Sequence, residues 1–446
     1  MYFLSLAFII FFLTFLLLFS FHKKTEIRKI LLLAANFIAY ALIDRQFFLV
    51  LLASSFFFAF FGKALQRNRS KGILAAGILL PVALLVLARW KGNLFAPVGL
   101  SFFLLQGISY LVDLYRGKIL QAYPVRDVMI YVSFFPLVIS GPIMKARDFL
   151  PQLNAVSRPD WQRISNGMQR FLLGLFEKLV IADRLSVAVN AVYGAPAAYS
   201  GGTLLFTAFL YMVRLYFDFA GYSHMAIALA NLLGFRICEN FDLPFLATNF
   251  SEFWKRWHIS LSSWLTEYVY FSVGGSRKGE LRTCLNLLLT MFVSGLWHGF
   301  SFGFILWGLL NGLILVIQRF YRRLSERKKK EQEHPVGKIL AQCLNSIVVV
   351  LIFIPFALGD YERIAIVIRR ICLMAQGVEY YFVYGMVFLP VLILDHILGE
   401  KKAKGHNWMK YLDLMKMKGK ILFVLLVFLT VLFAYFGNTA FIYEQF

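Results

Sequence analysis

The sequence predicts an all-α, polytopic integral membrane protein, with about 10–12 transmembrane helices and further broken or interfacial helices. Of its 446 residues, 60% are hydrophobic and 17% aromatic, and the mean hydropathy is +0.69. Soluble proteins are only about 45–50% apolar. The apolar runs are continuous, which predicts helices, because helices satisfy all their own backbone hydrogen bonds in lipid. The loops between the runs are short and basic, as cytoplasmic loops usually are.

The formal charge of +22 is the second feature that limits the possible functions. Such an excess of positive charge can indicate nucleic-acid binding. Here it lies in loops between apolar spans, so we expect no nucleic acid as a partner. We expect these loops to face the cytoplasm, where some hold anionic lipid head groups or an acidic donor. The four cysteines are far apart in sequence and predict neither a disulfide framework nor a zinc site.

The first quarter of the chain predicts simple spans. Residues 1–21 lack both a basic start and a small-residue cleavage site, so we expect a retained span with its N-terminus outside the cell. The basic loop 22–29 then lies in the cytoplasm. Four further apolar runs follow, at residues 30–43, 47–61, 73–87 and 98–114.

The middle of the chain departs from this pattern. Residues 128–150 contain Pro136 and the run Ser140-Gly-Pro142, which predict a broken helix surrounded by protein or a wet cavity. Residues 158–190 are amphipathic and are expected to lie at the interface or to line an interior. Arg214 and Asp218 are four residues apart in an apolar run, so we expect them to share a helical face and to pair.

The last part of the chain begins with an apolar stretch, residues 284–318, that must bend or break, since about 20 residues span a bilayer. The basic loop 319–338 is the clearest cytoplasmic anchor. Apolar runs at 339–358, 378–398 and 421–436 follow, which places the tail, residues 437–446, outside the cell. We interpret the whole chain, residues 1–446, as one domain in the cytoplasmic (inner) membrane.

Two histidines lie in or beside spans, where an ionisable group is costly and usually has a function. His298 lies in Ser294-Gly-Leu-Trp-His298, beside Gly295, Gly299 and Gly303, whose spacing predicts close helix packing. Imidazole exchanges a proton near neutral pH, so His298 is a candidate general base at the end of a tunnel. The alternative is tight helix packing around one buried, hydrogen-bonded histidine.

His258 lies in a segment, residues 251–264, that is rich in tryptophan and therefore suits the membrane interface. Ser251 and Glu252 are expected to cap the start of its helix. The alternative is an interfacial anchor in which His258 only accepts or donates a hydrogen bond. We predict no metal site, because the histidine pair has no evident carboxylate or thiol partner. The candidates for binding the donor or substrate are Lys255, Arg256, Trp257, Trp297, Asp218 and Arg277.

At this point the sequence resembles a known family, the membrane-bound O-acyltransferase (MBOAT) family. The resemblance is to its bacterial branch of alginate and peptidoglycan O-acetylation proteins and teichoic-acid D-alanylation proteins. The segments that carry it are Phe135-Pro-Leu-Val-Ile-Ser-Gly-Pro-Ile143, Tyr216-Phe-Asp-Phe-Ala-Gly-Tyr-Ser223, Asn240-Phe-Asp-Leu-Pro-Phe245, Glu252-Phe-Trp-Lys-Arg-Trp-His-Ile-Ser-Leu-Ser262 and Gly295-Leu-Trp-His-Gly299. With their flanking spans they cover residues 100–318.

The resemblance implies a ring of helices around a central tunnel. It implies that His298 is the catalytic histidine and that His258 lies on the cytoplasmic side of the tunnel. The donor would be acetyl-CoA or another acyl thioester, acting as a substrate, with no bound cofactor. An extracytoplasmic acetyltransferase or another polysaccharide-modifying protein would be the partner. The product would be an O-acetylated cell-envelope polysaccharide, such as alginate, peptidoglycan or another exopolysaccharide.

Three questions stay open at the level of sequence. The stretch 273–286 looks more like the acetylating members, but D-alanyl transfer from a carrier protein to teichoic acid is the alternative. The tail Phe441-Ile-Tyr-Glu-Gln-Phe446 resembles an aromatic ending of this branch, so Tyr443 is either an acyl relay or part of an aromatic plug. A transporter or flippase for a lipid-linked glycan would also suit many helices and basic loops, although no internal repeat is visible.

Overall fold

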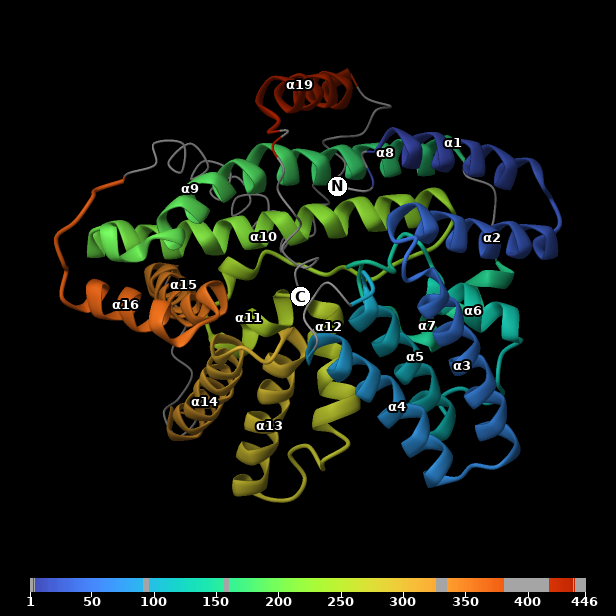
Figure 1. The fold of residues 1–446 in the computed structure, drawn as a ribbon, viewed down its shortest axis with the longest axis horizontal. Helices are drawn as coiled ribbons and strands as arrows, with labels where there is room; N and C mark the ends of the chain where they lie inside the picture. The colour runs from blue at the N-terminus through green and yellow to red at the C-terminus, as the bar shows by residue number, and fades with distance from the viewer. Residues whose placement is uncertain are drawn as a thin grey trace. The chain divides into compact units, whose positions relative to one another are not determined.

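A computed structural model describes residues 3, 5–90, 96–155, 160–325, 335–380, 417–435 and 437. Within these ranges the regular structure is helical and there is no β-strand (Figure 1). Five of the described helices are long and apolar enough to cross a membrane, and two shorter ones are also apolar. The all-α, polytopic membrane fold is therefore confirmed, whereas the number of spans stays a prediction.

The chain divides into two compact units. The first comprises Met1–Gly174, Tyr222–Glu239 and Ala440–Phe446, and the second comprises Leu175–Gly221 and Asn240–Thr439. The single domain expected from the sequence stays a prediction.

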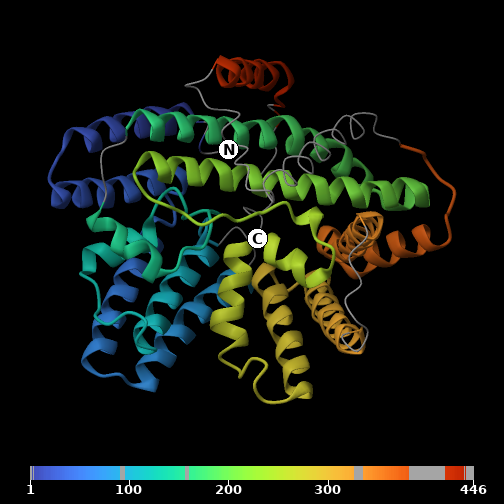
Figure 2. The ribbon, with the colours of Figure 1, turned by 180° about the vertical axis from the view of Figure 1, so that it is seen from behind.

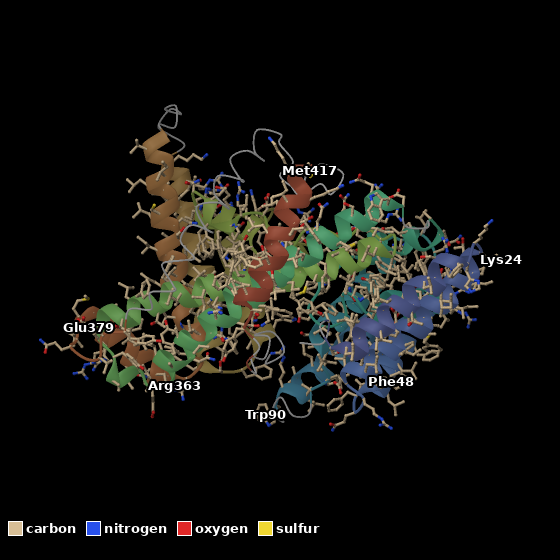
Figure 3. The ribbon with its side chains drawn as sticks, turned by 90° about the horizontal axis from the view of Figure 1, so that it is seen from above. Lys24, Phe48, Trp90, Arg363, Glu379 and Met417 are labelled. Carbon is tan, nitrogen blue, oxygen red and sulfur yellow. The ribbon has the colours of Figure 1, made fainter. Side chains whose placement is uncertain are left out.

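The first unit begins with consecutive apolar helices. Its elements are α1 (Leu6–Phe21), α2 (Thr25–Ile43), α3 (Phe48–Arg67), α4 (Lys71–Trp90), α5 (Leu100–Tyr115), α6 (Val125–Ser133), α7 (Ala146–Phe149), η3 (Leu150–Asn154), nearly all of α8 (Trp161–Phe176) and the end of α10 (Gly201–Leu232). Helix α5 packs against α3 and α4, and α6 packs against α3 (Figure 1). Lys24 lies in the turn between α1 and α2, and Phe48 begins α3 (Figure 3).

The broken helix predicted at residues 128–150 is confirmed. Helix α6 ends at Ser133, and no helix of this unit begins again before Ala146. The chain between them is buried. The Asn36 side chain donates to the carbonyl of Ile130 at 3.1 Å and accepts from the backbone N–H of Phe135 at 3.1 Å. The Asn36 side chain therefore supplies hydrogen bonds to backbone groups at the end of α6, where the helix itself provides no partner. A broken helix in a membrane requires such bonds.

The second unit contains the candidate site. Its elements are the end of α8, the π-helix η4 (Glu177–Ala182), α9 (Asp183–Gly194), η5 (Pro196–Ala198), most of α10, η6 (Pro244–Leu246), α11 (Phe250–Arg256), α12 (Ile259–Trp264), the π-helix η7 (Leu265–Tyr270), α13 (Glu280–His298), α14 (Phe302–Ser325), α15 (Pro335–Leu358), α16 (Tyr361–Cys372) and α19 (Met417–Phe433). Helix α14 packs against both α13 and α15 (Figures 1 and 2). Arg363 lies on α16, and the described chain continues beyond this helix to Glu379, which Figure 3 labels.

The long apolar stretch 284–318 breaks as the sequence predicts. Helix α13 ends at His298, and α14 begins at Phe302. Gly299, between them, has a φ of 151°, a conformation that favours glycine. The two helices then pack side by side as a hairpin (Figure 1).

A buried ion cluster shows that residues 178–183 of the amphipathic region face a protein interior. The ammonium group of Lys178, in η4, binds Asp183 and Asp218 at 2.6 Å each, and all three side chains are buried. The expected Arg214–Asp218 pairing is corrected, because Arg214 instead donates to Asn190 Oδ1 at 2.8 Å. Arg214 lies on a more exposed side of α10 than Asp218, so the two side chains find different partners.

Candidate functional site

His298 is the last residue of α13, and its side chain is only 3% exposed. The helix ends here because Gly299 adopts a conformation that a residue with a side chain rarely reaches. The His298 imidazole therefore lies at the end of a helix and inside the protein, a position from which a side chain can reach a bound substrate.

Aromatic rings surround the His298 imidazole on several sides. The centroid of its ring lies 4.7 Å from Trp297, 5.2 Å from Trp307 and 4.8 Å from Phe356, each in an edge-to-face arrangement. Such contacts hold a ring in a defined orientation and keep water away from it. The orientation of His298 is therefore set by α13, α14 and α15 together.

Glycines bring these helices close together. A Cβ atom on Gly295 would lie 2.4 Å from the carbonyl oxygen of Phe304, and one on Gly303 would lie 2.2 Å from that of Pro355. Gly308 faces Gly295 in the same contact. The close helix packing predicted from the glycine spacing is confirmed, and it places rings of α14 and α15 against His298.

His258 joins α11 to α12 in a left-handed backbone conformation, with φ 43° and ψ 53°. This conformation is uncommon for a residue other than glycine and costs about 1–3 kcal/mol, so the surrounding packing must hold it. The side chain is 1% exposed.

The sequence predicted the start of α11 slightly too late. The cap is Asn249, which accepts from the Glu252 backbone N–H at 3.0 Å, rather than Ser251.

Asn240 determines the tautomer of His258. Its Oδ1 accepts from the Ser260 hydroxyl at 2.8 Å and from the Ser260 backbone N–H at 3.4 Å. The same oxygen lies 3.0 Å from Nδ1 of His258. Because a carbonyl oxygen only accepts, Nδ1 carries the shared proton, and the lone pair of the neutral ring lies on Nε2.

The two histidines lie on the same tryptophan. The Trp297 ring is 4.7 Å from His298 and 6.0 Å from His258, measured between ring centroids. They are forty residues apart in sequence, so only the tertiary fold brings them together. This shared contact confirms neither catalytic role, but it makes the pair one candidate site.

Ring contacts continue from this pair into a closed circuit of eight side chains. Successive ring centroids are 4.6–6.0 Å apart around the circuit. In order, the members are His258, Phe219, Phe241, Trp257, Phe353, Trp307, His298 and Trp297. Of the candidates for binding the donor or substrate, only Trp257 and Trp297 belong to this circuit.

The other candidates lie outside it. Lys255 and Arg277 are exposed. Arg256 pairs with Glu252 at 2.8 Å and donates to the Asp242 carbonyl at 3.1 Å. Asp218 belongs to the buried ion cluster with Lys178. Their roles as contacts for the donor or substrate stay predictions.

Sequence reasoning did not select the phenylalanines of the circuit, nor Asn240, Trp307 and Phe356 beside the histidines. Asn240 begins one of the segments that carry the family resemblance, so its position was a usable signal. Trp307 and Phe356 had no comparable signal, because aromatic residues are common throughout such spans. In the ranges that the structure describes, no three His, Cys, Asp or Glu residues are placed to hold a metal ion. Tyr443 lies outside the described residues.

A pair of buried histidines in an aromatic enclosure, carried by apolar helices, is the kind of site expected of a membrane-embedded transferase. Comparison with known proteins gives the family. Residues 116–354 match the profile described as "MBOAT, membrane-bound O-acyltransferase family". The chain belongs to this family, since the match covers more than half of it.

Similar curated proteins fall into three groups. The chain is 42% identical to a probable alginate O-acetylase AlgI of Pseudomonas putida over 223 residues, which are 50% of this chain and 46% of that protein. It is 31% identical to a peptidoglycan O-acetyltransferase of Helicobacter pylori over 71% of this chain and 69% of that protein. It is 27% identical to a teichoic acid D-alanyltransferase of Bacillus subtilis over 53% and 62%. The matches to the alginate O-acetylases span less than half of their length.

Proposed function

We propose that this protein is an O-acetyltransferase of the cell envelope. It moves an acetyl group from a cytosolic thioester, acetyl-CoA, across the membrane toward a polysaccharide. The observation that carries the proposal is the placement of His298 and His258 on one buried tryptophan, within the segment that matches the family. The names of the alginate and peptidoglycan O-acetylating relatives support acetyl as the transferred group.

His298 acts as the general base of this reaction. Its imidazole takes the proton from an acceptor hydroxyl while the hydroxyl oxygen attacks the carbonyl carbon of the thioester. A carbon–oxygen bond forms and the carbon–sulfur bond breaks. The leaving thiolate takes the proton from the imidazolium, so the ring returns to its neutral form. The aromatic enclosure supports this role, because excluding water prevents hydrolysis of the thioester.

His258 positions the donor or assists proton transfer. The Asn240 contact directs its Nδ1–H into the protein, which leaves Nε2 as the basic atom of the ring. The exposed side chains of Lys255 and Arg277 are proposed to contact phosphate groups of the donor, and Arg256 is a further candidate. Tyr443 is proposed to relay the acyl group to an extracytoplasmic transferase. Acyl labelling of the protein that is unchanged in Tyr443→Phe would refute that relay.

Measuring ester-linked acetate on the envelope polysaccharide tests the proposed function. We expect His298→Gln to lower it by at least about a hundredfold, because general-base catalysis typically contributes that much. The matched control is His22→Gln, which changes a histidine in the loop between α1 and α2. Both proteins must be present in the membrane in equal amounts. Unchanged acetylation in the inserted His298→Gln variant would refute the proposal and favour a transport function.

D-alanyl transfer to teichoic acid is the second candidate, because the chain is also similar to teichoic acid D-alanyltransferases. The two reactions differ in their donor. Acetyl transfer predicts that the purified protein exchanges the acetyl group between acetyl-CoA and free coenzyme A slowly, in a manner that depends on His298. D-alanyl transfer predicts instead that an acyl-carrier protein co-purifies with the membrane protein.

A further inference from the structure

A cavity of about 370 Å³ lies at the basic end of α14, in the second unit. Its polar side chains come from α11, η7 and α14, and they are Ser251, Tyr270, Gln318, Arg319, Arg322 and Arg323. The three arginines are three and four residues apart, so they share one face of α14. Three guanidinium groups therefore line one small space.

One carboxylate only partly balances these charges. Glu280, the first residue of α13, forms ion pairs with both Arg319 and Arg323. The hydrogen bond from Arg319 and the charges of both arginines lower the pKa of Glu280, so it is ionised at neutral pH. Three guanidinium groups and one carboxylate leave about two positive charges at the cavity. Arg322 has no ion pair within the described part of the chain.

The frame of the cavity is held by hydrogen bonds between helices. Gln318 accepts from the Ser251 backbone N–H at 2.8 Å and donates to Asn249 Oδ1 at 2.7 Å. These bonds fix α14 to the start of α11, and Glu280 fixes α14 to α13. A preformed frame binds a ligand with less loss of conformational freedom.

The charge of the cavity selects the class of ligand. The planar fork of arginine matches phosphate oxygens, and a phosphomonoester carries about the two negative charges that the cavity lacks. A carboxylate would neutralise only one of them. The volume lies within the range of about 300–1,000 Å³ typical of small-molecule sites. The basic residues after α14 place this end in the cytoplasm by the positive-inside rule, where phosphate-bearing ligands occur.

We propose that this cavity binds a phosphate group. Arg322 is its principal ligand, and Arg319 and Arg323 divide their hydrogen bonds between the phosphate and Glu280. Two sources share this chemistry, namely a soluble phosphomonoester such as the 3′-phosphate of coenzyme A, and the head group of an anionic phospholipid. The inference does not depend on the proposed acetyl transfer, since no part of it uses His298.

Binding to the full-length protein in phosphatidylcholine nanodiscs tests this proposal. The soluble probes are coenzyme A and dephospho-coenzyme A, which lacks the 3′-phosphate. The lipid probe is phosphatidic acid added to the nanodisc, with its retention measured by native mass spectrometry. The test variant is Arg322→Gln, and the matched control is Arg282→Gln, which removes the same charge from an exposed position on α13 outside the cavity lining.

Each outcome decides the question. If coenzyme A binds about tenfold more weakly to Arg322→Gln, while dephospho-coenzyme A is unaffected, the phosphate comes from a soluble ligand. If retention of phosphatidic acid falls instead, the ligand is a lipid head group. If Arg322→Gln and Arg282→Gln behave alike with every probe, the proposal is overturned. His298→Gln should bind as the unaltered protein does, which separates this result from any failure of the acetyl-transfer proposal.

Discussion

Asn240 shows how much a single side chain decides at this site. One carbonyl oxygen accepts from the ring of His258 and from two groups of Ser260. It fixes both the position and the tautomer of the imidazole, although it touches no reacting atom in our mechanism. Asn240 is therefore a positioning residue.

Replacing Asn240 with alanine should lower acetyl transfer by about a hundredfold, because a small displacement of a catalytic group has this effect. The loss should appear mainly in kcat, and the pH dependence of kcat should change, because the protonated ring of His258 loses the oxygen that accepts from its Nδ1–H. Steady-state kinetics of reconstituted protein measure both quantities. Asn68→Ala, at the end of α3, is the control. A wild-type pH profile in Asn240→Ala would contradict the positioning role.

The α13–α14 hairpin shows what two helices contribute as elements. Gly299 ends the first helix, while Gly295 and Gly308 allow the two backbones to approach. The hairpin thereby carries His298 at one end and the cationic cavity toward the other. Two residues that line this cavity show the separation. Leu287 lies 11 positions before His298 on α13, and Gln318 lies 11 positions after Trp307 on α14. Each interval corresponds to roughly 16 Å along a helix.

Adding one methyl group to this hairpin should loosen it. Gly295→Ala brings a Cβ to 2.4 Å from a carbonyl oxygen, so the helices must separate, at a cost of about 1–3 kcal/mol. We expect a lower midpoint of thermal unfolding in detergent. Gly337→Ala on α15 is the control, because its Cβ would meet nothing within 4 Å. If the two variants unfold at the same temperature, the packing argument is wrong.

At the scale of the whole molecule, the distribution of basic loops predicts the orientation of the chain. The α1–α2 and α3–α4 turns, at Lys24 and Arg69, should face the cytoplasm, and the α2–α3 turn at Arg45 should face outward. In this prediction, successive turns lie on opposite sides of the membrane.

Cysteine labelling of intact cells measures this orientation. In a chain whose four cysteines are replaced by serine, a membrane-impermeant maleimide should label Arg45→Cys. Lys24→Cys and Arg69→Cys should react only after the membrane is opened. The reverse pattern would invert the predicted topology of these helices.

The sequence alone determined the membrane class, the helical fold, a break within residues 284–318 and the two histidines as candidates. These follow from local features, namely continuous apolar runs, a stretch too long for one span and ionisable groups within apolar stretches. Only the tertiary structure decided the partners of these groups. The ring circuit joins residues from 219 to 353, and Lys178 takes the place expected of Arg214 beside Asp218. The segment 319–338, which the sequence predicts to be a basic loop, begins inside α14, where its arginines line a cavity. Tertiary packing brings such residues together although they are far apart in the sequence. Local sequence patterns do not specify which distant side chains will be in contact.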